Sequence, residues 1–226
     1  KKNIPTYAEF YEGRYFTSGE ERITNFRLGE YEVPFGTNLL FCCEELPELV
    51  LGCEICEDLW VADPPSTSHA LAGATVIANL SASNETVSKD AYRELLVKST
   101  SARLLCGYIY TSAGEGESTQ DLVFGGHNLI AENGTLLAQS SRFATGILYT
   151  DLDVLKISSE RRRMGTFGKQ PTVSYCKIPF SMELTETKLE RKFAAHPFVP
   201  EDPALRNRRC EDILSIQAYG LKKRYE

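Results

Sequence analysis

Cys56 is the residue of this 226-residue chain whose position is best suited to covalent chemistry. It follows an apolar run at residues 49–52 that is typical of a buried strand, and it precedes acidic residues and the loop Asp63-Pro64-Pro65. A thiol at the end of a buried strand, on a sharp turn, is held rigidly with its sulfur open to a pocket, as a nucleophile has to be. Taken alone the residue is weak evidence, because free cysteines are usually buried and inert.

Amide hydrolysis is the chemistry that such a thiol performs. A base removes the thiol proton, the thiolate attacks the carbonyl carbon, a donor holds the oxyanion, and an acid protonates the departing ammonia. Glu57 and Asp58 place negative charge beside Cys56, which disfavours the thiolate. A cation or a base from elsewhere in the chain therefore has to offset them.

Three further segments accompany Cys56 in the sequence. They are KKNIPTYAEFYE at residues 1–12, ANLSAS at residues 78–83 and SAGEGEST at residues 112–119. Together with the run Glu-Ile-Cys-Glu-Asp-Leu-Trp around Cys56, they resemble the glutaminase domains of glutamine-dependent NAD synthetases, which are members of the nitrilase superfamily. The likeness runs from Lys1 to about Phe167 and resumes at residues 209–211 and 217–221. The ordered set of motifs is far more specific than any one of them.

The resemblance implies catalytic roles in the first segment. Lys1 matches the superfamily's catalytic lysine, which stands in a Lys-x-x-Leu-Pro pattern, although Ile4 replaces the leucine in this chain. Its ammonium would stabilise the tetrahedral intermediate beside the carbonyl oxygen. Glu9 matches a second glutamate that would orient the lysine and assist proton transfer, with Glu12 as a rival. Alternatively, Lys2 shifts the alignment by one position, Lys1 is an ordinary solvated residue, or both glutamates are surface carboxylates.

The general base of the superfamily is a glutamate on a strand well before the lysine. This chain has no residues there, so we assign no base. We expect the chain to be an internal piece of a longer polypeptide, and we expect residues 1–226 taken alone to be inactive as a glutaminase and poorly soluble.

Glutamine is the substrate that the resemblance implies. Free glutamine carries an ammonium and a carboxylate on one carbon, so its recognition needs a carboxylate together with hydroxyl or amide donors. Tyr7, Phe10, Glu12 and Ser83 occupy positions that line the glutamine pocket in the family. Glu12 would meet the ammonium, while Ser83 and Tyr7 would offer hydrogen bonds. The alternative for Tyr7 and Phe10 is an ordinary aromatic core.

The end of the chain resembles the start of a synthetase domain. That domain would receive the ammonia and amidate deamidated NAD with ATP and Mg²⁺, and no cofactor or metal site is expected in the glutaminase portion. The phosphate-binding loop that follows in the family is absent from residues 1–226. We further expect a homo-oligomer, and the cysteine content favours a cytoplasmic protein.

The order of predicted elements indicates an α/β protein. Strands are predicted at residues 39–43, 49–56, 75–80, 105–113 and 146–154, with a hairpin over residues 126–140 around Asn133-Gly134. Helices are predicted at residues 68–74, 88–105 and 205–225, with Ser88 as an N-cap. The resemblance makes the fold a nitrilase-like four-layer α-β-β-α sandwich, incomplete at its N-terminus. The predicted domains are a glutaminase portion at 1–167, a linker at 168–204 and the start of a synthetase domain at 205–226.

Composition excludes several classes of protein. The net charge of −6 argues against a nucleic-acid surface, and no apolar run approaches the roughly 20 residues of a membrane helix. The basic runs at residues 161–163 and 222–224 are expected to be solvated faces. The seven cysteines form an odd set within apolar segments, which indicates reduced thiols.

Several rival interpretations remain open from the sequence. Cys53-x-x-Cys56 matches a redox dithiol or half a zinc site, but there is no second such pair and Cys53 falls inside a predicted strand. The Gly-Glu-Gly-Glu-Ser-Thr run lacks the lysine of a phosphate-binding loop, so we expect only a tight loop near the site. The chain could also be a nitrilase-superfamily amidase for another small amide, or a nitrilase-like assembly module that no longer hydrolyses.

Overall fold

The computed structural model describes residues 2–20, 23–117, 121–168, 174–193 and 195–225. The chain separates into two compact units, Lys1–Lys188 and Leu189–Glu226. No helix in the described ranges is long and apolar enough to cross a membrane.

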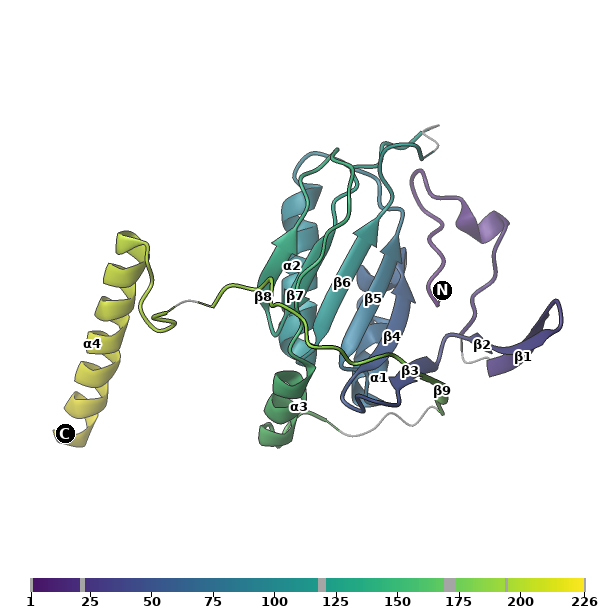
Figure 1. Cartoon of the computed structure of the whole chain (residues 1–226). Coiled ribbons are helices and arrows are strands. Elements are labelled where there is room, and N and C mark those ends of the chain that lie inside the picture. The colour runs from purple at the N-terminus through teal and green to yellow at the C-terminus, as the bar shows by residue number, and fades with distance from the viewer. Residues whose placement is uncertain (1, 21–22, 118–120, 169–173, 194, 226) are drawn as a thin grey trace. The chain divides into compact units, whose positions relative to one another are not determined.

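A seven-stranded sheet forms the centre of the first unit, in the order β8-β7-β6-β5-β4-β3-β9 (Figure 1). Its strands are β3 (Leu39–Cys43), β4 (Val50–Ile55), β5 (Val76–Ser81), β6 (Gly107–Ser112), β7 (Leu129–Glu132), β8 (Thr135–Gln139) and β9 (Cys176–Phe180). The strands β4, β5 and β6 are parallel, whereas β3 and β7 run antiparallel to their neighbours β4 and β6. The predicted α/β class is confirmed.

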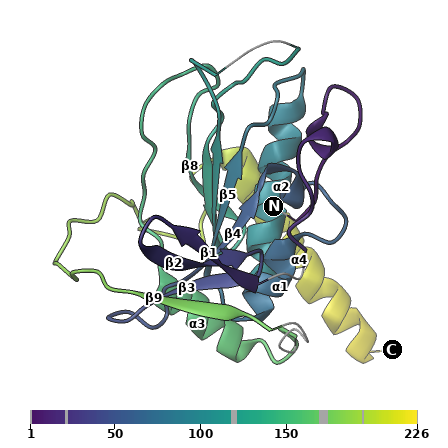
Figure 2. The same ribbon diagram turned by 90° about the vertical axis from the view of Figure 1, so that its right-hand side faces the viewer.

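Two helices cover one face of this sheet (Figure 1 and Figure 2). Helix α1 (Pro65–Leu71) connects β4 to β5, and helix α2 (Lys89–Leu104) connects β5 to β6. The core between sheet and helices is made of buried residues that include Leu40, Ala70, Ile77, Val97, Leu104, Tyr108 and Leu129. On the same strands Ile55 and Leu80 are 39% and 56% exposed. The seven-stranded sheet and the helices on its face thus form one β layer and one α layer of the predicted sandwich.

The third helix corrects two expectations. No strand is described at residues 146–154; helix α3 (Val154–Arg163) begins there instead. The side chain of Asp153 caps it by accepting the Lys156 N–H at 2.9 Å, and Val154 and Ile157 bury one helical face. Arg161 is not part of a solvated face, because its guanidinium donates to the carbonyls of Ala74, Leu104 and Leu105 at 2.7–3.0 Å. It thereby satisfies carbonyls at the end of α2.

Three other boundaries differ from prediction. Helix α1 begins three residues earlier than expected, with Pro65 in its first turn. Ser88 is wrong as a side-chain N-cap of α2, because its φ is +67° and its hydroxyl makes no capping bond. The predicted linker at 168–204 contains β9, which pairs in parallel with β3.

Along the sequence, a separate two-stranded ribbon follows the N-terminal segment and precedes the first strand of the large sheet. It consists of β1 (Ile23–Leu28) and β2 (Tyr31–Gly36), with a short 3₁₀ helix, η1 (Glu12–Arg14), before it. The Asn133-Gly134 hairpin between β7 and β8 is confirmed, with positive φ at both turn residues. In the second unit, helix α4 (Pro203–Tyr225) confirms the helix predicted there.

Candidate active site

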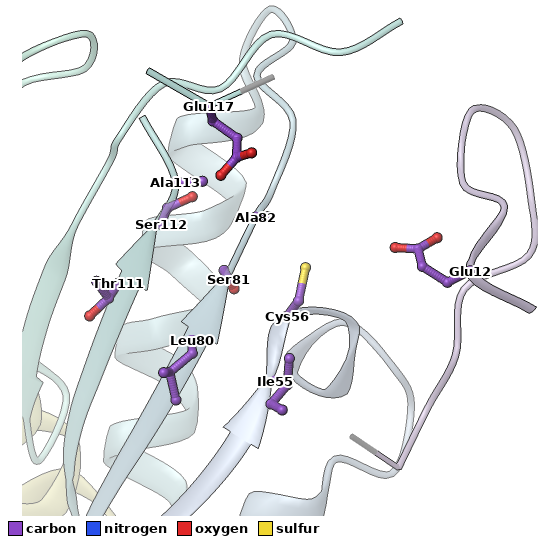
Figure 3. A pocket seen from close by; sticks show the side chains of 10 residues that line it. All are labelled: Glu12, Ile55, Cys56, Leu80, Ser81, Ala82, Thr111, Ser112, Ala113 and Glu117. Atoms are coloured by element: carbon purple, nitrogen blue, oxygen red, sulfur yellow. The ribbon is translucent and has the colours of Figure 1, made fainter. Parts of the chain in front are cut away.

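Cys56 lies where β4 ends and opens a short 3₁₀ helix, η2 (Cys56–Leu59). Its φ is +50°, in the left-handed region that residues with a side chain seldom adopt. Such a backbone costs on the order of 1–3 kcal/mol and persists only where the surroundings enforce it. The sharp turn directs the sulfur away from the strand and into open space (Figure 3). The predicted placement at a strand end on a tight turn is confirmed.

The side chains of Glu54, Asn79 and Tyr108 form a buried hydrogen-bond network that supports this turn. We call these three residues the nucleophile network. The Cys56 N–H donates to Asn79 Oδ1 at 3.2 Å. Asn79 Nδ2 in turn donates to Glu54 Oε1 at 3.4 Å and to the Tyr108 hydroxyl at 3.2 Å. Tyr108 donates to the same carboxylate, whose other oxygen accepts the Ser66 N–H at 2.8 Å. The amide of Asn79 can therefore point its oxygen only toward Cys56.

The charge state of Glu54 follows from its partners. Burial raises the pKa of its carboxyl, while the bonds from Tyr108, Ser66 and Asn79 lower it. Every one of these neighbours donates, so the geometry is that of a carboxylate acceptor. Burial also raises the pKa of Tyr108 well above its ordinary value, which keeps its hydroxyl a donor.

Asp58 attaches the N-terminal segment to the nucleophile turn. Its carboxylate accepts the Ile55 N–H at 3.0 Å within the turn, and it also accepts the Asn3 N–H at 2.7 Å and Asn3 Nδ2 at 2.9 Å. The Lys2 N–H lies 3.4 Å from the same carboxylate. Asp58 is 1% exposed, so these bonds are shielded from water. Lys1 itself lies outside the described residues.

A cavity of about 330 Å³ beside Cys56 brings together several residues singled out from the sequence. Its lining includes Cys56, Tyr7, Glu9, Phe10 and Ser83. Tyr7 and Phe10 pack edge to face, with ring centroids 5.6 Å apart. The Tyr7 hydroxyl donates to the carboxylate of Glu57 at 2.9 Å, and partial burial together with that carboxylate raises the pKa of Tyr7 to about 12. The Tyr7 hydroxyl is therefore a permanent donor at neutral pH.

Glu12 lines a second cavity, of about 560 Å³, which also includes Cys56 in its lining. Figure 3 shows the Glu12 carboxylate and the Cys56 thiol facing the same space, with Ile55, Leu80 and Glu117 around it. Glu12 Oε2 is buried and has no hydrogen-bond partner. The two cavities meet at Cys56, and the charge of Glu12 contributes to the raised pKa of Tyr7, so Glu12 stays a predicted partner of the same substrate as Ser83 and Tyr7. Glu117 belongs to the predicted tight loop, of which residues 118–120 lie outside the described ranges.

Lys89 is a residue of the smaller cavity that the sequence analysis did not identify. Its ammonium donates to Asn84 Oδ1, and Asn84 Nδ2 donates to Glu9 Oε1. It also lies 5.0 Å from the centroid of the Trp60 ring. Burial, and then the charge of Arg93, lower the pKa of Lys89. The sequence did carry a signal that could have identified Lys89. A lysine in the first turn of a predicted helix interacts unfavourably with the helix dipole, so its presence there indicates another role.

Cys53 does not have the surroundings of a redox or metal site. It lies inside β4, as expected, and does not open a helix as a thioredoxin-like pair does. All seven cysteines are unpaired in the structure, and their reduced state stays a prediction. Within the described ranges no group of three or more His, Cys, Asp or Glu side chains is arranged to hold a metal ion.

The fold and the thiol at the strand end agree with a family match. Residues 2–162 match the carbon-nitrogen hydrolase family, and the chain therefore belongs to that family. It is 44% identical over 234 aligned residues to the glutamine-dependent NAD(+) synthetase of Mycobacterium tuberculosis (strain ATCC 25618 / H37Rv), with 99% of this chain and 34% of that protein covered. The enzyme of the same name from Aquifex aeolicus is 30% identical over 176 residues, with 75% of this chain and 27% of that protein covered.

Solved structures give the same picture. A glutamine-dependent NAD(+) synthetase from Cytophaga hutchinsonii aligns with a TM-score of 0.53 at 31% identity, over 63% of this chain and 22% of that one. A carbon-nitrogen hydrolase from Helicobacter pylori G27 aligns with a TM-score of 0.54 at 21% identity, over 73% of this chain and 54% of that one, and supports the fold alone. The chain spans about a third of the length of the mycobacterial relatives that it matches.

Proposed function

We propose that this chain carries the glutamine-hydrolysing site of a glutamine-dependent NAD synthetase. The observation that carries the proposal is the strained turn of Cys56, held by the nucleophile network and opening on a cavity lined by Tyr7, Glu9 and Ser83. A thiol fixed in this way beside hydrogen-bonding groups suits acyl transfer from a small polar amide.

In the proposed reaction the Cys56 thiolate attacks the side-chain amide carbon of glutamine. The resulting oxyanion is stabilised by the ammonium of Lys1, whose neighbours Lys2 and Asn3 are bonded to Asp58. The carbon–nitrogen bond then breaks, ammonia leaves with one added proton, and a thioester remains on the sulfur. Water cleaves the thioester to give glutamate and the free thiol. Glu9 would orient Lys1 and assist proton transfer, and we assign the general base to no described residue.

Recognition of the amino-acid end of glutamine follows from charge. Lys89 would pair with the α-carboxylate, while Ser83 and Tyr7 offer hydrogen bonds and Phe10 packs on the aliphatic stem. The α-ammonium shares a carbon with that carboxylate, so its partner has to lie nearby. Glu12, with one unpaired oxygen, is the partner implied by the resemblance; Glu57, in the smaller cavity, is the geometric alternative. Discrimination against analogues lacking the ammonium would be relaxed by Glu12→Gln in the first case and by Glu57→Gln in the second.

The ammonia would pass to a synthetase domain that amidates deamidated NAD with ATP and Mg²⁺. This step rests on the resemblance to relatives three times longer than the chain. A cytoplasmic location is supported by the seven free thiols, and the homo-oligomer remains a prediction.

The test is Cys56→Ala in the intact protein. We expect glutamine-dependent NAD formation to be abolished while free ammonium still supports it, because only the thioester step needs the sulfur. Cys53→Ala is the matched control, since Cys53 lies three residues away inside β4, and it should leave both activities nearly unchanged. NAD formation from glutamine in Cys56→Ala would refute the assignment. Ammonia release from other small amides but not from glutamine would favour a different amidase of the family.

A further inference from the structure

A second buried network lies behind the segment that carries Ser83, and the proposed reaction makes no use of it. Its centre is Arg93 on α2, which is 0% exposed. Arg93 Nη1 donates to Glu85 Oε2 at 3.2 Å and to His127 Nδ1 at 2.9 Å. We call Glu85, Arg93 and His127 the recognition network. A guanidinium is seldom buried unless it is paired, so its burial in this network calls for a specific reason.

The protonation state of His127 follows from its two partners. Arg93 can only donate, so His127 Nδ1 has to accept. The neutral ring then carries its proton on Nε2, which lies 2.7 Å from the side-chain amide of Gln139 on β8. The structure places Gln139 Nε2 at that position, and since two donors cannot bond, the amide has to be turned so that its oxygen accepts from the ring. A second proton on His127 would set two donors and two positive charges against each other at Nδ1.

The recognition network joins two loops. The Glu85 N–H donates to the Val123 carbonyl at 2.6 Å, and Asn84 forms an isolated bridge with Phe124. A Cβ on Gly125 would collide with the Glu85 carboxylate, so this glycine lets the two loops approach closely. His127 comes two residues later, and its bond to Arg93 completes the junction. Residues 83–86 are thus held against residues 123–127.

The same segment carries the proposed glutamine contacts. Ser83 and Asn84 immediately precede Glu85, and the Asn84 amide bridges Lys89 and Glu9. Lys89 lies one helical turn before Arg93, on the same side of α2. A shift of Glu85 would therefore move the Asn84 amide, and with it the ammonium proposed to bind the substrate carboxylate.

We propose that Arg93 is a positioning residue for substrate recognition, and that it holds residues 83–86 and Lys89 in the glutamine-binding geometry only while His127 is neutral. The inference rests on the proposed function. It adds that binding of glutamine, rather than the thioester chemistry, weakens in acid.

The charged groups around His127 set the direction of its titration. Arg93 and Asp90 face it from α2, Glu85 faces it from the loop after β5, and Arg142 faces it from the segment after β8. Arg142 also lies 3.7 Å from Glu85 and 3.5 Å from Asp90. Burial and the two arginines lower the pKa of His127 from 6.5, against the opposing pull of the two carboxylates. The neutral form therefore persists at neutral pH and is lost only below it.

The experiment measures KM and kcat for glutamine, by ammonia release from the intact protein, from about pH 7.5 to well below the ordinary histidine pKa of about 6.5, because the pKa of His127 is lowered from that value. In the wild type we expect KM to rise about tenfold toward the acid end of this range, because the loss of one charge-assisted hydrogen bond has about this effect on binding. In His127→Gln, which keeps one acceptor and one donor, KM at pH 7.5 should stay within about twofold and the acid rise should disappear. Arg93→Lys should raise KM about tenfold at every pH with kcat nearly unchanged.

The outcomes separate this inference from the proposed function. If the wild type releases no ammonia from glutamine, the proposed function fails. If it does, but His127→Gln keeps the acid rise in KM, only the present inference is overturned. A fall in kcat without a change in KM for Arg93→Lys would also overturn it. Should Arg93→Lys fail to fold by circular dichroism, the pH profile of His127→Gln decides alone.

Discussion

The two buried polar networks of this protein differ in how completely their groups are paired. In the nucleophile network every contact of Glu54 comes from a donor, and burial raises the pKa of Tyr108 well above its ordinary value. In the recognition network Arg93 keeps two buried nitrogens without partners, and His127 is a base whose pKa burial has lowered. The comparison indicates that the fold fixes the nucleophile rigidly and leaves the recognition segment adjustable.

The largest expected effect comes from removing the anion of the nucleophile network. Glu54→Leu deprives Asn79 and Tyr108 of a shared acceptor, so the Asn79 amide loses the orientation that presents its oxygen to Cys56. Each unpaired buried donor costs about 1–3 kcal/mol, and we expect kcat to fall about 100-fold with KM for glutamine nearly unchanged. Steady-state ammonia release gives both constants.

Tyr108→Phe tests the same prediction with a smaller change, because it removes one donor and leaves the Glu54 carboxylate in place. Its loss in kcat should be smaller than that of Glu54→Leu. A rise in KM as large as the fall in kcat in either variant would show that the two networks do not have separate tasks.

Acid should act on the nucleophile side through stability rather than through KM. His69 on α1 is bonded to the Cys53 carbonyl at 3.1 Å and to the Tyr175 hydroxyl at 2.8 Å, and burial lowers its pKa from 6.5 to about 4. As the pH falls, His69 is protonated in the unfolded chain before it is protonated in the folded protein. The contribution of neutral His69 to folding stability is therefore complete above pH 6.5 and is lost as the pH falls toward 4. The loss amounts to about 3 kcal/mol, at about 1.4 kcal/mol per pKa unit. Denaturant unfolding of wild type and His69→Gln across this range measures it, and parallel profiles would contradict it.

Lys89 tests the recognition side directly. Lys89→Ala removes the ammonium proposed to bind the substrate carboxylate, and KM for glutamine should rise about 10- to 100-fold with a small change in kcat. Lys98→Ala is the matched control, because Lys98 is on the same helix, is not among the residues that line the cavity, and pairs with Glu94 in a partly exposed i,i+4 bridge. An unchanged KM in Lys89→Ala would remove this residue from the glutamine site.

Ser83 should give the smallest effect. Its hydroxyl lines the smaller cavity and is buried, and Ser83→Ala deletes one neutral hydrogen bond to the substrate. We expect KM to rise about three- to tenfold, the size of a single such bond. If Ser83→Ala lowered kcat and left KM unchanged, the hydroxyl would belong with the nucleophile network instead.

Local chemistry accounts for the parts of the fold that the sequence predicted well. The strand before Cys56 and the Asn133-Gly134 turn depend on neighbouring residues, and both were found as expected. The strand predicted at 146–154 was wrong: residues 146–153 form no regular element, and the Asp153 cap and the burial of Ile157 favour a helix from Val154. The strand β9 was missed because it is stabilised by pairing with β3, more than 130 residues earlier in the chain.

The candidate site shows the same limit. Cys56, Tyr7 and Ser83 stand in motifs that could be recognised in order along the chain, and they line one cavity. Lys89 and Arg93 belong to no motif, and only the packing of α2 against the loops gives them a role. Glu12 lines the neighbouring cavity that shares Cys56, and its place in the glutamine pocket stays a prediction.

The bonds from Asp58 to Asn3 have a consequence for the order in which the site forms during folding. Strands β4 and β5, on either side of the turn at Cys56, pair residues that are about 25 positions apart in the sequence. Asp58 and Asn3 are 55 positions apart. Closing the longer loop costs more chain entropy, so contacts of this kind form late. The thiol turn should therefore be assembled before the segment around Asn3 reaches it, and the folding protein would expose its nucleophile before it can use it.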